Sequence, residues 1–128
     1  MATNYYGAGS FVATAAISAN RLVVISPDRG VVACVSGKYP DGVTLEDAAA
    51  GDYVAVQFWN SGGTIKASCT SGPVTVGSIV FAEAGGRVGR TAGALITVGR
   101  SLTTATAAQT AAGLAVIEVM PGWWTANN

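Results

Sequence analysis

The stretch Leu22-Val23-Val24-Ile25-Ser26-Pro27-Asp28-Arg29-Gly30-Val31-Val32-Ala33-Cys34-Val35 decides the fold class of this chain. Two runs of aliphatic and mostly β-branched residues, the type that strands favour, flank a polar turn. Pro27 fixes the backbone angle φ at the start of that turn, and Gly30 leaves φ free at its end. The stretch therefore predicts a β-hairpin between residues 22–25 and residues 31–35.

Similar runs recur about every ten residues, and Gly, Pro, Asn and Asp separate them. In the run from Tyr53 to Phe58 the apolar side chains alternate, as they do in a strand with one buried face. A second hairpin is expected where Asn60-Ser61-Gly62-Gly63 joins residues 53–59 to residues 64–68. Even spacing of short runs predicts a mainly β fold, a small β-barrel-like or sandwich domain. The runs that carry this prediction are residues 21–25, 31–35, 53–58, 64–68, 78–82 and 114–120.

Helix is expected to be scarce. Residues 45–51 allow one helical turn that ends at Gly51, and the Ala-rich residues 103–112 allow either a short helix stopped by Gly113 or a loop. No linker or internal repeat divides the sequence, so we expect one domain over residues 1–128. Its expected parts are a flexible N-terminal arm (1–11), a β core (12–120) and a C-terminal tail (121–128).

The composition points to an assembling protein. Charged residues make up 11% of the 128 residues and apolar residues 50%, with a net charge of zero. Typical soluble domains carry about 25% charged residues. Because exposed apolar patches usually mark interfaces, we expect other subunits to cover part of this surface.

The charge pattern and hydropathy argue against nucleic acid and membrane as partners. Phosphate binding requires clustered cations, and the cations here are dispersed: Arg21, Arg29, Lys38, Lys66, Arg87, Arg90 and Arg100. No apolar run approaches the 18 or so residues of a membrane span, and the N-terminus lacks a signal-peptide pattern. Synthesis and retention in the cytosol are therefore expected.

The sequence offers little catalytic chemistry. The absence of His removes Ser-His-Asp and Cys-His catalysis and leaves no zinc ligand set around Cys34 and Cys69. In the cytosol these two cysteines are expected as buried thiols, with a disulfide as the alternative.

Glu46 with Asp47 or Asp52 is expected to be a solvated group at a turn rather than a carboxylate pair for catalysis. Gly85-Gly86-Arg87-Val88-Gly89-Arg90 lacks the Gly-Lys-Ser/Thr ending of a phosphate loop, so it predicts a hairpin turn. We expect no enzyme, no catalytic residue, no cofactor and no metal.

The tryptophans are the candidate interface residues. Trp59, Trp123 and Trp124 can stack on sugars, anchor a partner protein or pack into the core. Trp is enriched at interface hot spots because it buries a large area at a small entropy cost. The sequence leaves these alternatives open.

Several segments together resemble a known family. They are Met1-Ala2-Thr3-Asn4-Tyr5, Ser26-Pro27 ahead of Gly30-Val31-Val32-Ala33, residues 47–56, residues 76–88, Gly99, and the strand from Gly113 to Val119 after an Ala/Thr loop. Along nearly the whole chain they resemble the capsid decoration, or cement, proteins of tailed bacteriophages, which are related in fold to the head decoration protein of phage lambda. Residues 57–70 and the Trp123-Trp124 tail depart from the family pattern.

The resemblance implies a homotrimer on the outside of a phage head, where it clamps subunits of the major capsid protein. An N-terminal arm over Ala2–Phe11 would order against the shell, with Thr3, Asn4, Tyr5, Tyr6 and Phe11 as candidate capsid-binding residues. Three arms on one trimer would raise the effective concentration at the shell. The expected location is the virion exterior after synthesis in the host cytoplasm. The alternatives are a carbohydrate-binding or adhesion module and another virion component such as a tail or neck subunit.

Overall fold

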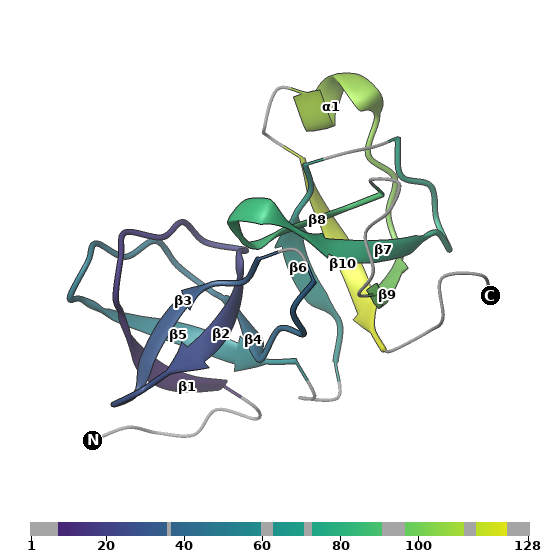
Figure 1. Cartoon of the computed structure of the whole chain (residues 1–128). Helices are drawn as coiled ribbons and strands as arrows, with labels where there is room; N and C mark the ends of the chain where they lie inside the picture. The colour runs from purple at the N-terminus through teal and green to yellow at the C-terminus, as the bar shows by residue number, and fades with distance from the viewer. Residues whose placement is uncertain are drawn as a thin grey trace.

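The computed structural model describes residues 8–35, 37–59, 63–70, 73–90, 97–111 and 115–122. Within these ranges the chain folds into two β lobes that meet at an angle (Figure 1). The first lobe is a closed barrel with the strand order β1-β3-β2-β4-β5. Its strands are β1 (Ala8–Ala13), β2 (Leu22–Ser26), β3 (Gly30–Ala33), β4 (Gly42–Thr44) and β5 (Tyr53–Phe58).

The second lobe is a five-stranded sheet with the order β6-β10-β9-β7-β8. A parallel bridge between Cys69 and Val88 links its two edges. Its strands are β6 (Ile65–Ser68), β7 (Ile79–Glu83), β8 (Arg87–Gly89), β9 (Thr97–Ser101) and β10 (Val116–Pro121). The 3-10 turn Ala84–Gly86 connects β7 to β8, and the short helix α1 (Ala107–Ala111) lies between β9 and β10.

The two lobes repeat one pattern of strand pairing. Leu22 of β2 pairs with Val43 of β4. The residues 57 positions later, Ile79 of β7 and Arg100 of β9, pair in the same way. The Ile17–Ala48 bridge recurs at Val74–Ala105 with the same offset. The offset rises to 63 at β10 because the second lobe has extra residues, including α1, after Ala105. The sequence was expected to hold no repeat, and that expectation is wrong at the level of structure.

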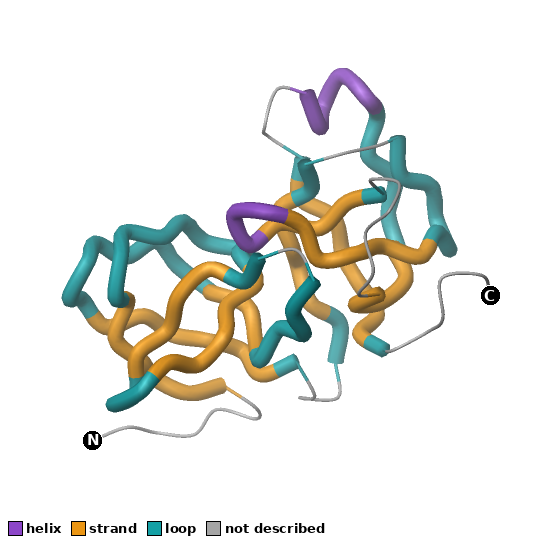
Figure 2. Tube along the Cα trace, viewed as in Figure 1, coloured by secondary structure: helices purple, strands orange, loops and turns teal. Residues whose placement is uncertain are grey.

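Backbone geometry repeats together with the pairing. The β2–β3 turn has positive φ at Asp28 and Arg29 (62° each), and the β7–β8 turn has positive φ at the equivalent Gly85 and Gly86 (77° and 73°). In the first lobe the loops extend to the end away from the second lobe (Figure 2). The lobes therefore share one architecture although few of their side chains match.

Two buried clusters hold the molecule together. One fills the first barrel and includes Phe11, Val23 and Val54. The other fills the second lobe and extends into the first lobe through Leu22 and Trp59. Because the second cluster contains residues of both lobes, the lobes pack against each other through a continuous apolar core.

The mainly β fold is confirmed, and so is the hairpin of the opening stretch, since β2 pairs with β3 in antiparallel fashion. The turn at residues 85–90 is also confirmed as a hairpin turn between β7 and β8. The second predicted hairpin is wrong, because β5 pairs with β1 and β4 whereas β6 pairs with β10. β5 and β6 lie in different lobes, so the Gly-rich sequence between them does not join the strands of one hairpin.

The remaining local predictions have mixed outcomes. Residues 107–111 form a short helix, one of the two alternatives left open for residues 103–112, whereas residues 45–51 form bends and the Ala48 bridge instead of a helical turn. Cys34 and Cys69 are free, buried thiols. No helix in the described ranges has the length and apolar character needed to cross a membrane.

Candidate functional site

The candidate functional site is the junction between the lobes, where buried residues of both lobes meet. On the first lobe, Leu22, Cys34 and Val43 are buried together with residues of the second lobe such as Ile65. Leu22 and Val43 are neighbours across the β2–β4 ladder. Both belong to the surface of the first lobe against which the second lobe packs. We call this surface the docking face and define it by Arg21, Leu22, Cys34, Val43 and Trp59.

A glycine turn of the second lobe docks on this face. The backbone N–H of Gly86 donates to the carbonyl oxygen of Cys34 at 2.9 Å, and Nη1 of Arg21 donates to the carbonyl oxygen of Gly85 at 3.0 Å. A Cβ on Gly86 would lie 2.6 Å from the carbonyl oxygen of Leu22, and φ of Gly86 is +73°. Both the backbone conformation and the close approach require glycine at this position.

Trp59 fastens the junction from the other side. Its side chain is 5% exposed, and its indole N–H donates to the carbonyl oxygen of Val98 at 3.1 Å. Trp59 directly follows β5, whereas Val98 lies in β9, so this bond crosses from lobe to lobe. A buried Trp with a satisfied N–H supplies both apolar area and orientation. Trp59, a candidate for an interface with a partner, is thus buried between the two lobes of its own chain.

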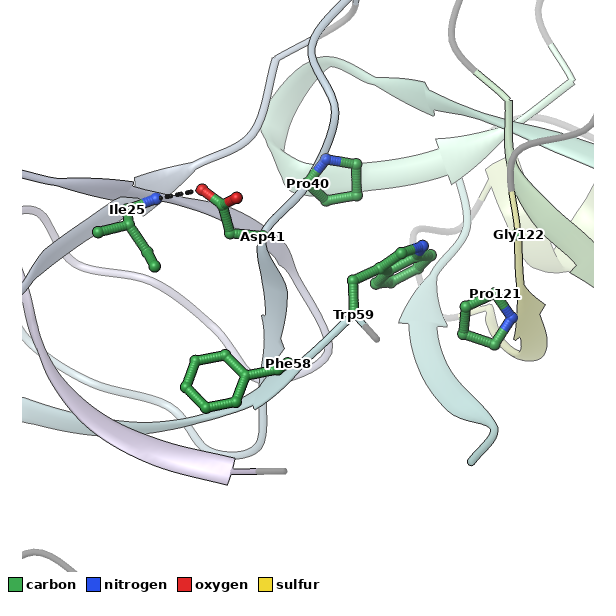
Figure 3. A pocket seen from close by; sticks show the side chains of 7 residues that line it. All are labelled: Ile25, Pro40, Asp41, Phe58, Trp59, Pro121 and Gly122. Atoms are coloured by element: carbon green, nitrogen blue, oxygen red, sulfur yellow. Dashed lines mark hydrogen bonds between the residues drawn. The ribbon is translucent and has the colours of Figure 1, made fainter. Parts of the chain in front are cut away.

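A cleft of about 460 Å³ opens beside Trp59. Figure 3 shows the Trp59 indole between Pro40 of the first lobe and Pro121 of the second. Oδ2 of Asp41 at the rim accepts a hydrogen bond from the backbone N–H of Ile25 at 2.8 Å. The full lining consists of Ile25, Pro40, Asp41, Phe58, Trp59, Pro121 and Gly122. With one carboxylate among apolar side chains, this lining has the character of a packing surface rather than of an acid/base site.

The thiol of Cys34, a residue of the docking face, has low reactivity. Burial is the largest cause that raises the pKa of its thiol, to about 11, and the nearby Asp41 carboxylate adds to the effect. Its Sγ donates weakly to the carbonyl oxygens of Val35 and Lys38. At neutral pH the thiol is protonated, and because the thiolate is the reactive form, Cys34 is a poor nucleophile. Among the described residues no cluster of His, Cys, Asp or Glu is arranged to hold a metal ion.

Phe11, the last residue of the predicted capsid-binding arm, is part of the first barrel. Its ring makes an edge-to-face contact with Phe58 at a centroid distance of 5.9 Å and an angle of 88°. The guanidinium of Arg29 lies 4.7 Å from the centre of the Phe11 ring, and its Nη2 donates to the carbonyl oxygen of Ser10 at 2.6 Å. These contacts hold the first half of β1, which directly follows residues 1–7, in the barrel.

The other predicted site residues lie outside the described residues. These are Thr3, Asn4, Tyr5, Tyr6, Trp123 and Trp124. The structure therefore brings Trp59 to the junction and Phe11 to the barrel.

Four exposed apolar side chains at equivalent positions of the two lobes were not singled out from the sequence. Leu45 and Leu102 are equivalent in the two lobes, and they are 49% and 39% exposed. The equivalent residues Tyr53 and Val116, which begin β5 and β10, are exposed as well. The backbone N–H of Leu45 donates to the carbonyl oxygen of Ala55, and that of Leu102 donates to the carbonyl oxygen of Glu118. Each acceptor lies two residues after the first residue of its strand, β5 or β10. The spacing of 57 between two Leu residues could have revealed these pairs, but only after the repeat was known.

No family model and no curated protein matches the sequence. The fold does match a solved structure, the N base of the head fiber protein gp8.5 of bacteriophage phi29, with a TM-score of 0.72. The match covers 95% of each chain at 17% sequence identity. This chain therefore has the fold of that head fiber base over nearly its whole length, including both lobes.

Proposed function

We propose that this protein is a structural virion protein, a decoration or cement protein on the outer surface of a phage head. The observation that carries the proposal is the fold match, which extends over both lobes to the base of a protein whose name places it on a phage head. The sequence segments that resemble phage decoration proteins point independently to the same class. Because one fold can host different functions, shell binding is the measurement that decides the role of this chain.

The surface supports a role in protein binding. At equivalent positions the two lobes expose apolar residues, Leu45 and Tyr53 in the first lobe and Leu102 and Val116 in the second. Exposed apolar side chains that gather on a surface favour contact with another protein. A protein that carries the same feature twice is suited to a surface that is itself repeated, such as a shell built from one major capsid protein.

The proposal includes a homotrimer and an N-terminal arm. Arg29 and Phe11 anchor β1 in the barrel, and the residues ahead of Ala8 continue from that anchored strand. An arm that starts from a rigid root binds a shell at a lower entropy cost than a fully mobile segment. The partner at the shell would be the major capsid protein, with neither nucleic acid nor a cofactor taking part.

The test is co-sedimentation of the purified full-length protein with DNA-free phage shells, with its mass in solution measured by light scattering. We expect a trimer that binds shells in saturable fashion, and a variant lacking residues 2–7, which keeps β1 (Ala8–Ala13), that stays trimeric but no longer binds. A folded protein that ignores every shell offered, or shell binding that survives loss of the arm unchanged, would contradict the proposal. Replacing Leu45 and Leu102 with Ser separates a role of these exposed leucines from that of the arm.

The two alternatives from the sequence are weighed by specific observations. A sugar-binding role for Trp59 is disfavoured because its ring is buried and its N–H is bound to Val98. A glycan array with tryptophan fluorescence tests Trp123 and Trp124. A tail or neck subunit predicts rings of six or twelve copies in place of a trimer, which the same light-scattering measurement distinguishes.

A further inference from the structure

The last described residues of the chain lie at the wall of the cleft between the lobes. Pro121, the last residue of β10, and Gly122 both line this cleft. The backbone N–H of Gly122 and the indole N–H of Trp59 donate to the same carbonyl oxygen, that of Val98, each at 3.1 Å. Because both nitrogens bind one oxygen, the chain leaves β10 directly beside Trp59.

The next two residues along the chain are Trp123 and Trp124. Consecutive Cα atoms are about 3.8 Å apart, so a tryptophan side chain at position 123 reaches the cleft without any intervening chain. A tether of one residue gives a high effective concentration, which favours a contact within the chain over a contact between copies. The C-terminal tail is therefore the segment best placed to cover the cleft.

The cleft suits an indole ring in size and in chemistry. Its volume of about 460 Å³ falls within the roughly 300–1,000 Å³ of pockets that hold whole small molecules. Pro40, Phe58 and Trp59 supply apolar and aromatic surface, on which a further aromatic ring packs well. Asp41 at the rim accepts one hydrogen bond, from the N–H of Ile25. Since a carboxylate accepts about four, it can also accept a bond from an indole N–H.

Side-chain alternation along β10 distinguishes the two tryptophans. On one face Ile117 and Val119 are buried, whereas Val116 and Met120 on the other face are 46% and 41% exposed. Pro121 belongs to the first face, and its ring borders the cleft (Figure 3). Side chains two residues apart in a strand share a face, so the next position on the face of Pro121 is 123.

The extended pairing continues beyond the last residue of β10. Pro121 pairs with Gly99 of β9, and the bond from Gly122 to Val98 carries this pairing one residue further. The alternation therefore applies up to the start of the tail. We propose that the indole of Trp123 occupies the cleft of its own chain and that Trp124 faces away from it.

A ring in this position contacts both lobes. Ile25, Pro40 and Phe58 of the first lobe line the same cleft as Pro121 of the second lobe. The tail thereby stabilises the junction between the lobes. This contact lies within one folded chain, so it goes beyond the proposed function and does not depend on shell binding.

The first test compares Trp123→Ala with Trp124→Ala in the full-length protein, by acrylamide quenching of tryptophan fluorescence. Trp123→Ala removes a shielded indole and uncovers Trp59, so the average quenching constant should rise. Trp124→Ala, the matched control one residue away, removes an accessible indole, so the average quenching constant should fall. Equal changes in the two variants, or changes in the reverse order, would overturn the inference.

The second test is urea unfolding of the same variants. Trp123→Ala should raise the equilibrium constant for unfolding roughly tenfold, because buried aromatic area is lost. Trp124→Ala should change it by about twofold at most, as is usual for a surface substitution. An unfolding constant that Trp123→Ala leaves unchanged would contradict the docking of this ring.

A double-mutant cycle shows whether Trp123 contacts the first lobe. Ile25 lines the cleft and is 48% exposed. The effect of Ile25→Ala on the unfolding constant should be about threefold smaller once Trp123 is replaced by alanine. Val116→Ala, 46% exposed at the opposite end of β10 from Pro121, should have the same effect in both backgrounds. Additive effects of Ile25→Ala and Trp123→Ala would count against the contact.

The third test identifies the copy that fills the cleft. Nuclear Overhauser contacts between the Trp123 ring and Pro40 are expected in the wild-type protein, and in a mixture of isotope-labelled and unlabelled copies they should arise within one copy. Contacts only between copies, or no contact between these two residues, would refute the proposal. This measurement needs no substitution, so it decides the question if Trp123→Ala does not fold. None of the three tests involves a phage shell, so their outcome is independent of the shell-binding experiment.

Discussion

Gly42 and Gly99 occupy equivalent positions in the two lobes, and each lies against the backbone of the next strand. A Cβ on Gly42 would be 2.5 Å from the carbonyl oxygen of Gln57, and a Cβ on Gly99 would be 2.3 Å from that of Met120. Real Cβ atoms do not approach backbone so closely, so both positions require glycine for steric reasons. The two lobes therefore repeat the close approach of a glycine to the neighbouring strand as well as the pairing of the strands.

Gly42→Ala and Gly99→Ala are expected to destabilise the protein by about 2 kcal/mol or more each, because the backbone of β5 or β10 must shift. The measurement is urea unfolding followed by circular dichroism. Gly63→Ala is the matched control, since no atom lies within 4 Å of its Cβ position. Equal stability of Gly99→Ala and Gly63→Ala would show that the close approach does not constrain the sheet.

Gly86→Ala is expected to weaken the lobe junction more than Gly77→Ala weakens the second lobe. Both glycines have positive φ, which costs alanine about 1 kcal/mol, but only Gly86 also faces the backbone of Leu22. The comparison separates backbone strain from steric overlap. The readout is the free energy of unfolding, with limited proteolysis at the junction as a second measure. Identical losses for the two variants would argue against the docking role of the turn.

Trp59→Phe is expected to cost about 1 kcal/mol, because it keeps most of the apolar area but removes one of the two hydrogen bonds that the Val98 carbonyl accepts, the other coming from the backbone N–H of Gly122. Trp59→Ala should cost about 3–5 kcal/mol, because it also creates a cavity between the lobes. Denaturant unfolding measures both. A Trp59→Phe variant as stable as the wild type would indicate that the bond to Val98 contributes little to the junction.

The Cys34 thiol is expected to resist alkylation in the native protein at pH 8 and to react once the chain is unfolded. Its pKa is raised from the ordinary value of 9.0 to about 11 in the folded state. A raised folded pKa means that the folded state holds the proton more tightly, so the associated stability is complete below pH 9. That stability is lost as the pH rises from about 9 through 11.

Replacing Cys34 with Ala removes this titration. The variant should lose less stability than the wild type between pH 9 and pH 11, as measured by thermal melting across that range. Parallel curves for the two proteins would contradict the assignment of the raised pKa to the buried thiol. Cys69, which is also buried, remains in both proteins and therefore does not affect the comparison.

The sequence by itself determined the β class of the fold, because alternation and turn chemistry are local. Val54 and Val56 face the barrel interior as their spacing predicted, and the hairpin around Pro27 forms as expected. Short strands with mixed patterns escaped detection, among them β4 and β8, since three residues give no usable period.

Tertiary structure decided how the strands are partnered and where the site lies. The Gly-rich residues 60–63 carry turn chemistry, but β5 and β6 belong to different sheets because each finds a better partner elsewhere in the chain. The repeat is carried by backbone pairing rather than by side-chain identity, so it left almost no trace in the sequence. Burial of Trp59 depends on Val98, which lies 39 residues away, and no local pattern specifies such a contact. Alternation and turn chemistry therefore determined the fold class, whereas long-range packing decided which strands pair and which side chains are buried between the lobes.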